Sequence, residues 1–153
     1  MLTKGIVEED FVNFRKPAMT IMMPHCDWKC GADLCQNSPL AQMETIVVNP
    51  STLIQRYIKN PITEAIVFSG LEPMWDFEDV ISIIKTLRSI NEDMVIIYTG
   101  YNPEELVSQL DTLRQFKNII VKFGRFIPNE EYHFDQVLGI SLASSNQYAE
   151  QIS

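Results

Sequence analysis

The sequence has no long apolar run, few basic residues and no apolar segment near its start. No stretch approaches the roughly 18 apolar residues of a membrane-spanning helix, so we expect no membrane partner. Twelve Lys and Arg stand against twenty Asp and Glu, which gives a net charge of −8. Such a surface repels phosphate backbones and argues against a nucleic-acid polymer as partner. The first 17 residues lack the apolar core of a signal peptide, so we expect a cytoplasmic protein.

Cysteine is also scarce, because the chain has only three, all between positions 26 and 35. In the reducing cytoplasm such thiols stay free, and an odd number in one short loop does not make a disulfide framework. The 153 residues, of which 46% are apolar, are enough to bury a core. We therefore expect a single domain, residues 1–153, that gathers all its thiols in one loop.

Short β-rich segments alternate with helical segments along the chain. A strand–helix–strand order is typical of parallel βαβ crossovers, and almost continuously apolar strands indicate a sheet covered by helices. Four such strands are too few for a closed eight-stranded barrel. The sequence therefore predicts an α/β fold with an open or partial (βα) barrel of parallel strands. The expected strands are 18–23, 64–70, 94–100 and 118–123, and the expected helices are 49–60, 76–90 and 102–116, capped by Asn49, Asp76 and Asn102.

The unusual stretches of the sequence follow these strands. The cysteine loop comes after the first strand, and "SGLEP" (69–73) ends the second. "YTGY" (98–101) ends the third strand and "FGRF" (123–126) ends the fourth. In open sheets and in barrels, ligands bind at the carboxyl ends of parallel strands. We therefore expect all four stretches on one rim, with Glu72 as a candidate ligand.

The three cysteines have the spacing Cys26-x3-Cys30-x4-Cys35. Closely spaced thiolates select zinc, copper(I) or iron–sulfur clusters. A zinc site would add His25 as its fourth ligand, and three unligated thiols are the simplest alternative. A closed four-iron cluster normally takes four cysteines, so three would leave one iron open to a substrate or cofactor.

These motifs, taken in order, resemble those of radical S-adenosylmethionine (SAM) enzymes, most of all the small activating enzymes of anaerobic ribonucleotide reductase. "CQN" (35–37) resembles the Cys-His-Asn after the family's last cysteine, and "SGLEP" resembles its Gly-Gly-Glu-Pro motif. "YTGY" and "FGRF" are similar to two further family segments, and "LASSNQ" (142–147) is similar to the family's Ser-Asn-Gln ending. The resemblance covers roughly residues 18–150.

The resemblance implies a [4Fe–4S] cluster and SAM as cofactors. Cys26, Cys30 and Cys35 would hold three irons, and the amino and carboxylate groups of SAM would chelate the fourth. One electron would then cleave SAM to a 5′-deoxyadenosyl radical, which would take a hydrogen atom from a glycine of a partner such as anaerobic ribonucleotide reductase. An electron donor such as flavodoxin or ferredoxin is implied as a second partner.

The same resemblance implies which residues contact SAM. Gly70, Glu72 and Pro73 would line its methionine end. Thr99 would contact its ribose, and Leu34 would lie against its adenine.

Two features differ from the family pattern. The family has two residues between its second and third cysteines, whereas this chain has four, and Leu71 stands at the position of the motif's second glycine. We expect the extra residues to bulge outward and Leu71 to turn its side chain away from SAM, into the packing of the sheet, with a negative φ. Two other functions stay open: a radical SAM enzyme acting on a small nucleotide-like substrate, and a non-catalytic iron–sulfur or zinc module.

Overall fold

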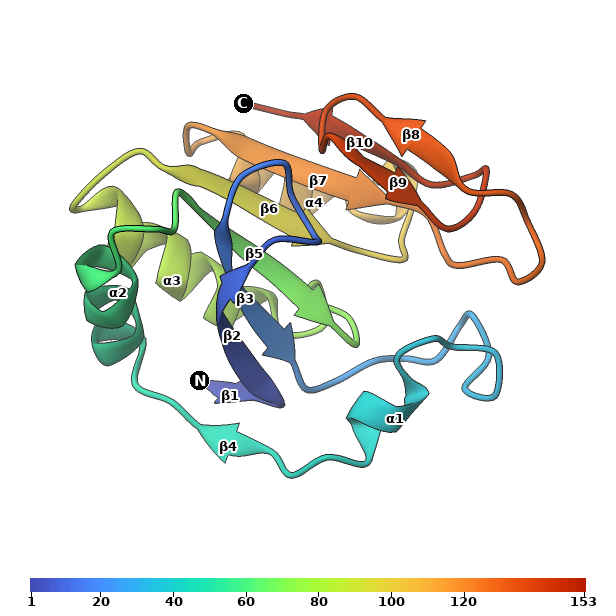
Figure 1. The fold of residues 1–153 in the computed structure, drawn as a ribbon, viewed down its shortest axis with the longest axis horizontal. Coiled ribbons are helices and arrows are strands. Elements are labelled where there is room, and N and C mark those ends of the chain that lie inside the picture. The colour runs from blue at the N-terminus through green and yellow to red at the C-terminus, as the bar shows by residue number, and fades with distance from the viewer.

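The computed structural model describes residues 1–153 and is built around one six-stranded sheet (Figure 1). Its four central strands run parallel, and an antiparallel strand lies at each edge. Because the two edge strands do not pair with each other, the sheet curls without closing. This is the predicted α/β partial barrel. In spatial order the strands are β10 (Tyr148–Gln151), β7 (Ile119–Phe123), β6 (Met94–Tyr98), β5 (Ala65–Gly70), β3 (Ala18–Met23) and β2 (Gly5–Asp10).

Three helices cover one face of the sheet: α2 (Pro50–Lys59), α3 (Phe77–Arg88) and α4 (Val107–Leu113). Their apolar sides and the strands form a single cluster of 22 buried residues, all of them apolar. The predicted helix 102–116 is shorter than expected. It begins as a 3-10 turn, η1 (Pro103–Glu105), and breaks at Leu106, whose φ of −124° leaves the helical region.

The predicted caps differ in outcome. The Asn49 side chain accepts hydrogen bonds from the backbone N–H groups of Ser51 and Thr52, as an N-cap does. Asp76 begins α3 without a side-chain cap, because its carboxylate contacts His25 Nδ1 at 2.6 Å instead. That cap prediction is wrong, and the contact ties α3 to the start of the cysteine loop.

The opposite face of the sheet is covered by extended segments that the sequence did not reveal. A hairpin of β8 (His133–Asp135) and β9 (Ile140–Leu142) packs there together with the segment 11–16. A second pair, β1 (Leu2–Thr3) and β4 (Ile46–Val47), and the short helix α1 (Ser38–Ala41) complete the fold. None of the helices has the length and apolar character required to cross a bilayer.

Strand alternation gives the two faces of the sheet different chemistry. Successive side chains of a strand point to opposite faces, so the helix side receives only apolar residues from the parallel strands. On the other face the residues nearest the carboxyl ends are mostly polar, and all of them line one cavity. They are Met22, Ser69, Tyr98 and Lys122.

Candidate functional site

A cavity of about 700 Å³ lies at the carboxyl ends of the parallel strands. Each of the four strands contributes the segment that follows it to the cavity lining. In Figure 1 the long loop after β3 extends beyond the carboxyl end of that strand. The expectation that the unusual stretches share one rim is therefore confirmed. Cys26, Cys30 and Cys35 all line this cavity, together with Gly70, Glu72 and Thr99.

The cysteine loop is shaped by short-range hydrogen bonds that involve its sulfurs. The backbone N–H of Trp28 donates to Cys26 Sγ at 3.3 Å, and the N–H of Asn37 donates to Cys35 Sγ at 3.4 Å. Trp28 adopts a φ of 58°, which is uncommon for a bulky residue and allows the tight turn at Cys26. Residues 32–34 are exposed, so the extra residues of this loop do bulge outward.

The surroundings of Cys26 and Cys30 raise the pKa of both thiols and so favour their protonated forms. Burial raises the pKa of Cys26, and the nearby negative charge of Glu72 raises it further. The hydrogen bond from the Trp28 N–H lowers this pKa and so opposes both effects. Burial also raises the pKa of Cys30, with a further contribution from Cys35. A bound cation reverses this balance, because thiolates are the ligand form, so metal loading would release protons.

The end of the cysteine loop is attached to the second parallel strand. Asn37, the last residue of "CQN", donates from Nδ2 to the carbonyl of Gly70 at 2.8 Å. Gly70 has a φ of +96°, and a Cβ there would lie 2.7 Å from the backbone nitrogen of Met23. Only glycine fits this close crossing of β3 and β5, and its carbonyl is thereby turned toward the loop.

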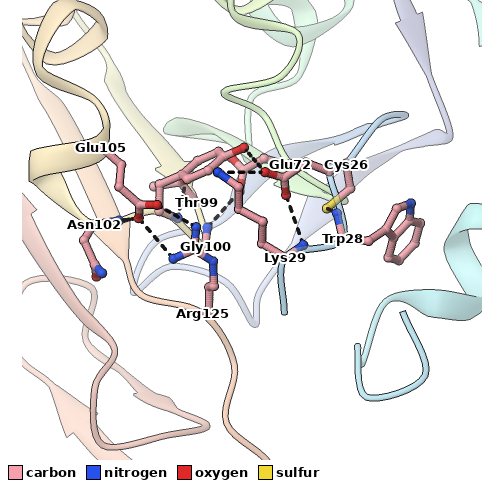
Figure 2. Close-up of polar contacts among 11 residues, drawn as sticks. Cys26, Trp28, Lys29, Glu72, Thr99, Gly100, Asn102, Glu105 and Arg125 are labelled. Atoms are coloured by element: carbon pink, nitrogen blue, oxygen red, sulfur yellow. Dashed lines mark hydrogen bonds and ion pairs between the residues drawn. The ribbon is translucent and has the colours of Figure 1, made fainter. Parts of the chain in front are cut away.

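Glu72 connects two strand ends from inside the rim (Figure 2). Its side chain is 4% exposed, its Oε2 accepts the N–H of Gly100 at 2.8 Å, and its Oε1 accepts the N–H of Met74 at 3.0 Å. Burial raises the pKa of this carboxyl, while the two backbone donors oppose the shift. A carboxylate has about four acceptor positions, so Glu72 retains capacity for a cationic ligand.

The other predicted SAM contacts are not all brought to the cavity. Thr99 is buried in its wall, where its Oγ1 accepts the N–H of Tyr101 at 3.1 Å. Pro73 is buried but lies behind the wall. Leu34 is 57% exposed in the bulge and lies outside the cavity, so its adenine contact stays a prediction.

Residues 17–148 match a protein family described as a 4Fe-4S single cluster domain. The chain belongs to this family. No curated protein and no solved structure matches it.

The cysteine loop of this 4Fe-4S single cluster domain fits such a cluster chemically. Three free, half-buried thiols share one cavity wall, and thiolates are the ligands that iron–sulfur clusters take. Backbone N–H groups already point at two of the sulfurs, and hydrogen bonds to sulfur are one means by which proteins tune a cluster. No group of three or more His, Cys, Asp or Glu side chains lies close enough together to surround a single metal ion.

The zinc alternative needs His25 beside the three cysteines. In the structure His25 contacts Asp76, and its side chain does not line the cavity. The four-ligand zinc set is therefore not assembled. Leu71 has no positive φ, as expected, but it lines the cavity instead of packing into the sheet, so that half of the prediction is wrong.

Sequence reasoning missed a lysine inside the cavity. Lys122 is 6% exposed, and its Nζ donates to the carbonyl of Gly124 at 2.9 Å. Burial lowers the pKa of Lys122 to about 8, although the charge of Glu72 acts in the opposite direction. The signal was available, because a lysine within the apolar strand "NIIVKF" falls on the face opposite to the helices.

Sequence reasoning also missed a buried aspartate, Asp10, next to the segment 11–12 that forms one lip of the cavity. Asp10 accepts hydrogen bonds from the Thr20 hydroxyl and from the N–H groups of Val12 and Asn13. These bonds fix the segment that follows β2, in which Phe11 is 65% and Val12 75% exposed while both line the cavity. The lip therefore presents two apolar side chains on a rigid backbone.

Proposed function

We propose that the chain is a radical SAM enzyme whose [4Fe–4S] cluster is held by Cys26, Cys30 and Cys35. The observation that carries the proposal is one cavity lined by the three thiols of a single loop and by a buried carboxylate from the adjacent strand end. Three cysteines leave one iron without a protein ligand, and that is the position a SAM-binding cluster needs. When bound, the cluster supplies one electron that cleaves SAM to methionine and a 5′-deoxyadenosyl radical.

The residues of the cavity supply groups that match the charged end of SAM. Glu72 would accept hydrogen bonds from the methionine amine, and Lys122 has two N–H donors beyond its bond to Gly124 for the methionine carboxylate. The backbone of Gly70, which lies next to the cysteine loop, would line the methionine end of SAM. The Thr99 hydroxyl would contact the ribose. Pro73 supports the turn behind Glu72.

We propose a glycyl-radical enzyme, such as an anaerobic ribonucleotide reductase, as the substrate. Support comes from the order of the sheet, because its edge strands β2 and β10 do not pair with each other and the partial barrel is not closed. The lip there carries Phe11 and Val12 beside Glu9, so it suits an uncharged segment better than a phosphate-bearing nucleotide. The electron would come from a donor such as flavodoxin or ferredoxin in the cytoplasm, where thiols stay reduced.

The test is the affinity for SAM of the cluster-loaded protein and of its Glu72→Gln variant under anaerobic conditions. Loss of one charge-assisted hydrogen bond costs about 1.5–3 kcal/mol, so we expect the affinity to fall about ten- to a hundredfold. Iron content should not change. Glu64→Gln is the matched control, because Glu64 lies at the opposite end of β5 on the surface.

Unchanged SAM affinity in Glu72→Gln would remove Glu72 from the binding site and leave it only as the link between two strand ends. Absence of SAM binding by the loaded wild-type protein would contradict the proposal as a whole and favour a non-catalytic iron–sulfur module.

A further inference from the structure

The segment between the first two cysteines is fastened to the rim through one aromatic side chain, Tyr101. The Tyr101 hydroxyl donates to Asp27 Oδ2 at 2.6 Å. The ammonium of Lys29 lies 5.1 Å from the centre of the same ring and 3.3 Å from Asp27 Oδ2. Both polar residues of the Cys26–Cys30 segment thus contact Tyr101, the last residue of "YTGY".

Tyr101 also has a second cation near its ring, Arg125, which Figure 2 shows beside Glu105. The Arg125 guanidinium lies 5.2 Å from the ring centre, so the ring lies within reach of two cations. Glu105 binds Arg125 through both of its oxygens, at 2.8 and 3.0 Å, and accepts the N–H of Asn102 at 2.9 Å. Three strand-end loops therefore meet at this ring.

The rest of the cysteine loop has few other attachments to the barrel. Its start is held at His25 and its end at Asn37. Between these points the backbone hydrogen bonds of residues 28–35 stay within the loop, and residues 32–34 are exposed. The contacts with Tyr101 are the ones that fix the position of the Cys26–Cys30 segment relative to the cavity.

We propose that Tyr101 is a positioning residue for the cluster: through Asp27 and Lys29 it sets how Cys26 and Cys30 face the cavity. The proposal depends on the cluster of the family and does not depend on SAM. Every readout below is taken without SAM, so a failure of the proposed SAM chemistry would leave the result unaffected.

The first experiment compares wild type with Tyr101→Phe, which keeps the ring near its two cations and removes only the hydroxyl. In the cluster-free protein we expect hydrogen–deuterium exchange of residues 26–30 to rise about tenfold, equivalent to about 1.4 kcal/mol, with no change at residues 35–40. Tyr132→Phe is the control, because Tyr132 is exposed and far from the loop in the sequence.

The second experiment measures the loaded protein, by the rate of iron removal with a chelator and by the EPR spectrum of the reduced cluster. Tyr101→Phe and Asp27→Ala should each speed iron loss by a similar factor and shift the g-values. The double variant should show no further change, because both substitutions break the same contact. Asp27→Asn keeps an acceptor oxygen for the hydroxyl and should lie closer to wild type than Asp27→Ala.

Two results would overturn the proposal. One is that Tyr101→Phe shows the same hydrogen–deuterium exchange, the same rate of iron loss and the same EPR spectrum as wild type. The other is a lowered melting temperature in that variant with an unchanged spectrum, which would make Tyr101 a structural residue only.

Discussion

The two faces of the sheet show how this small domain separates stability from chemistry. The helix face packs 22 buried aliphatic, aromatic and Met residues, and the one hydroxyl among them, that of Tyr57, donates to Asp93 at 2.8 Å. The other face has a smaller apolar cluster of nine buried residues, and the cavity beside it is lined by the buried polar residues Asp10, Glu72 and Lys122. Because strand alternation assigns each residue to one face, the polar side chains can change there with little effect on the helix-covered core.

The polar groups on the cavity face are costly unless they have partners, and most of them do. Asp10 accepts hydrogen bonds from the segment it holds, and Glu72 accepts two backbone N–H groups. Lys122 is the exception, since one carbonyl satisfies only one of its three N–H donors. An incompletely satisfied buried cation marks the place where a ligand would add interactions.

The largest effect on the cavity face is expected from the cysteines. Cys26→Ala, Cys30→Ala or Cys35→Ala should each abolish stable cluster binding, whereas anaerobically reconstituted wild type should hold about four irons. The unfolding free energy of the cluster-free variants should stay within about 0.5 kcal/mol of wild type, because the loop is only half-buried. Iron analysis and chemical denaturation check both parts. Stoichiometric zinc without iron in the wild type would contradict this prediction.

On the helix face the largest effect should be on stability. Ile84 is fully buried in α3, and Ile84→Ala should lower the unfolding free energy by about 2–5 kcal/mol through the cavity it leaves. The cluster should still load into the folded fraction with an unchanged spectrum. Denaturant unfolding, followed by iron analysis at a temperature where the variant is folded, measures the two effects separately. A large shift in the cluster spectrum of Ile84→Ala would show that packing on the helix face affects the cavity face.

Lys122→Met should produce a pH-dependent effect on the cavity face. Because burial lowers the pKa of Lys122 from 10.5 to about 8, the unfolded chain binds more protons than the folded one between about pH 8 and 10.5. Wild-type stability should therefore rise across this window relative to Lys122→Met, by up to about 3 kcal/mol. Unfolding of the cluster-free proteins at several pH values measures the difference.

The control for this pH effect is Lys117→Met, whose side chain is exposed and pairs with Glu92 on the surface. The stability of wild type relative to Lys117→Met should not change between about pH 8 and 10.5. A wild-type profile parallel to that of Lys122→Met would mean that Lys122 keeps an ordinary pKa in the folded protein.

The smallest effect is expected at the start of α2. Asn49→Ala removes the cap of the Ser51 and Thr52 N–H groups and should cost about 1 kcal/mol of stability. Asn49→Asp keeps a capping oxygen and should restore most of it. Both variants should load iron as wild type does. Thermal unfolding detects the difference, and equal melting temperatures for all three proteins would contradict the capping role.

The helix-covered half of the fold could be predicted from the sequence because its signals are local. The strand 18–23 has the predicted bounds, and the helices around Leu53 and Ile84 follow from apolar spacing and end residues. The edge strands β2 and β10 could not be predicted in this way. Their sequences "GIVEED" and "YAEQ" carry charged residues, and they become strands only by pairing with segments elsewhere in the chain.

The site could be predicted only in part for a similar reason. Its cysteines and Glu72 lie in motifs, and the order of the strands brings these motifs to one rim. Asp10 and Lys122 belong to no motif, so they reach the cavity through the sheet alone. The outward position of Leu34 depends on how a bulged loop folds, which its spacing does not determine.

The most direct test of the central claim is SAM cleavage by the reconstituted protein under strict anaerobiosis. With dithionite as reductant, we expect wild type to form 5′-deoxyadenosine and methionine from SAM, whereas Cys30→Ala should form neither. A wild-type protein that holds about four irons, and yet releases no 5′-deoxyadenosine with or without a glycyl-radical partner, would contradict it.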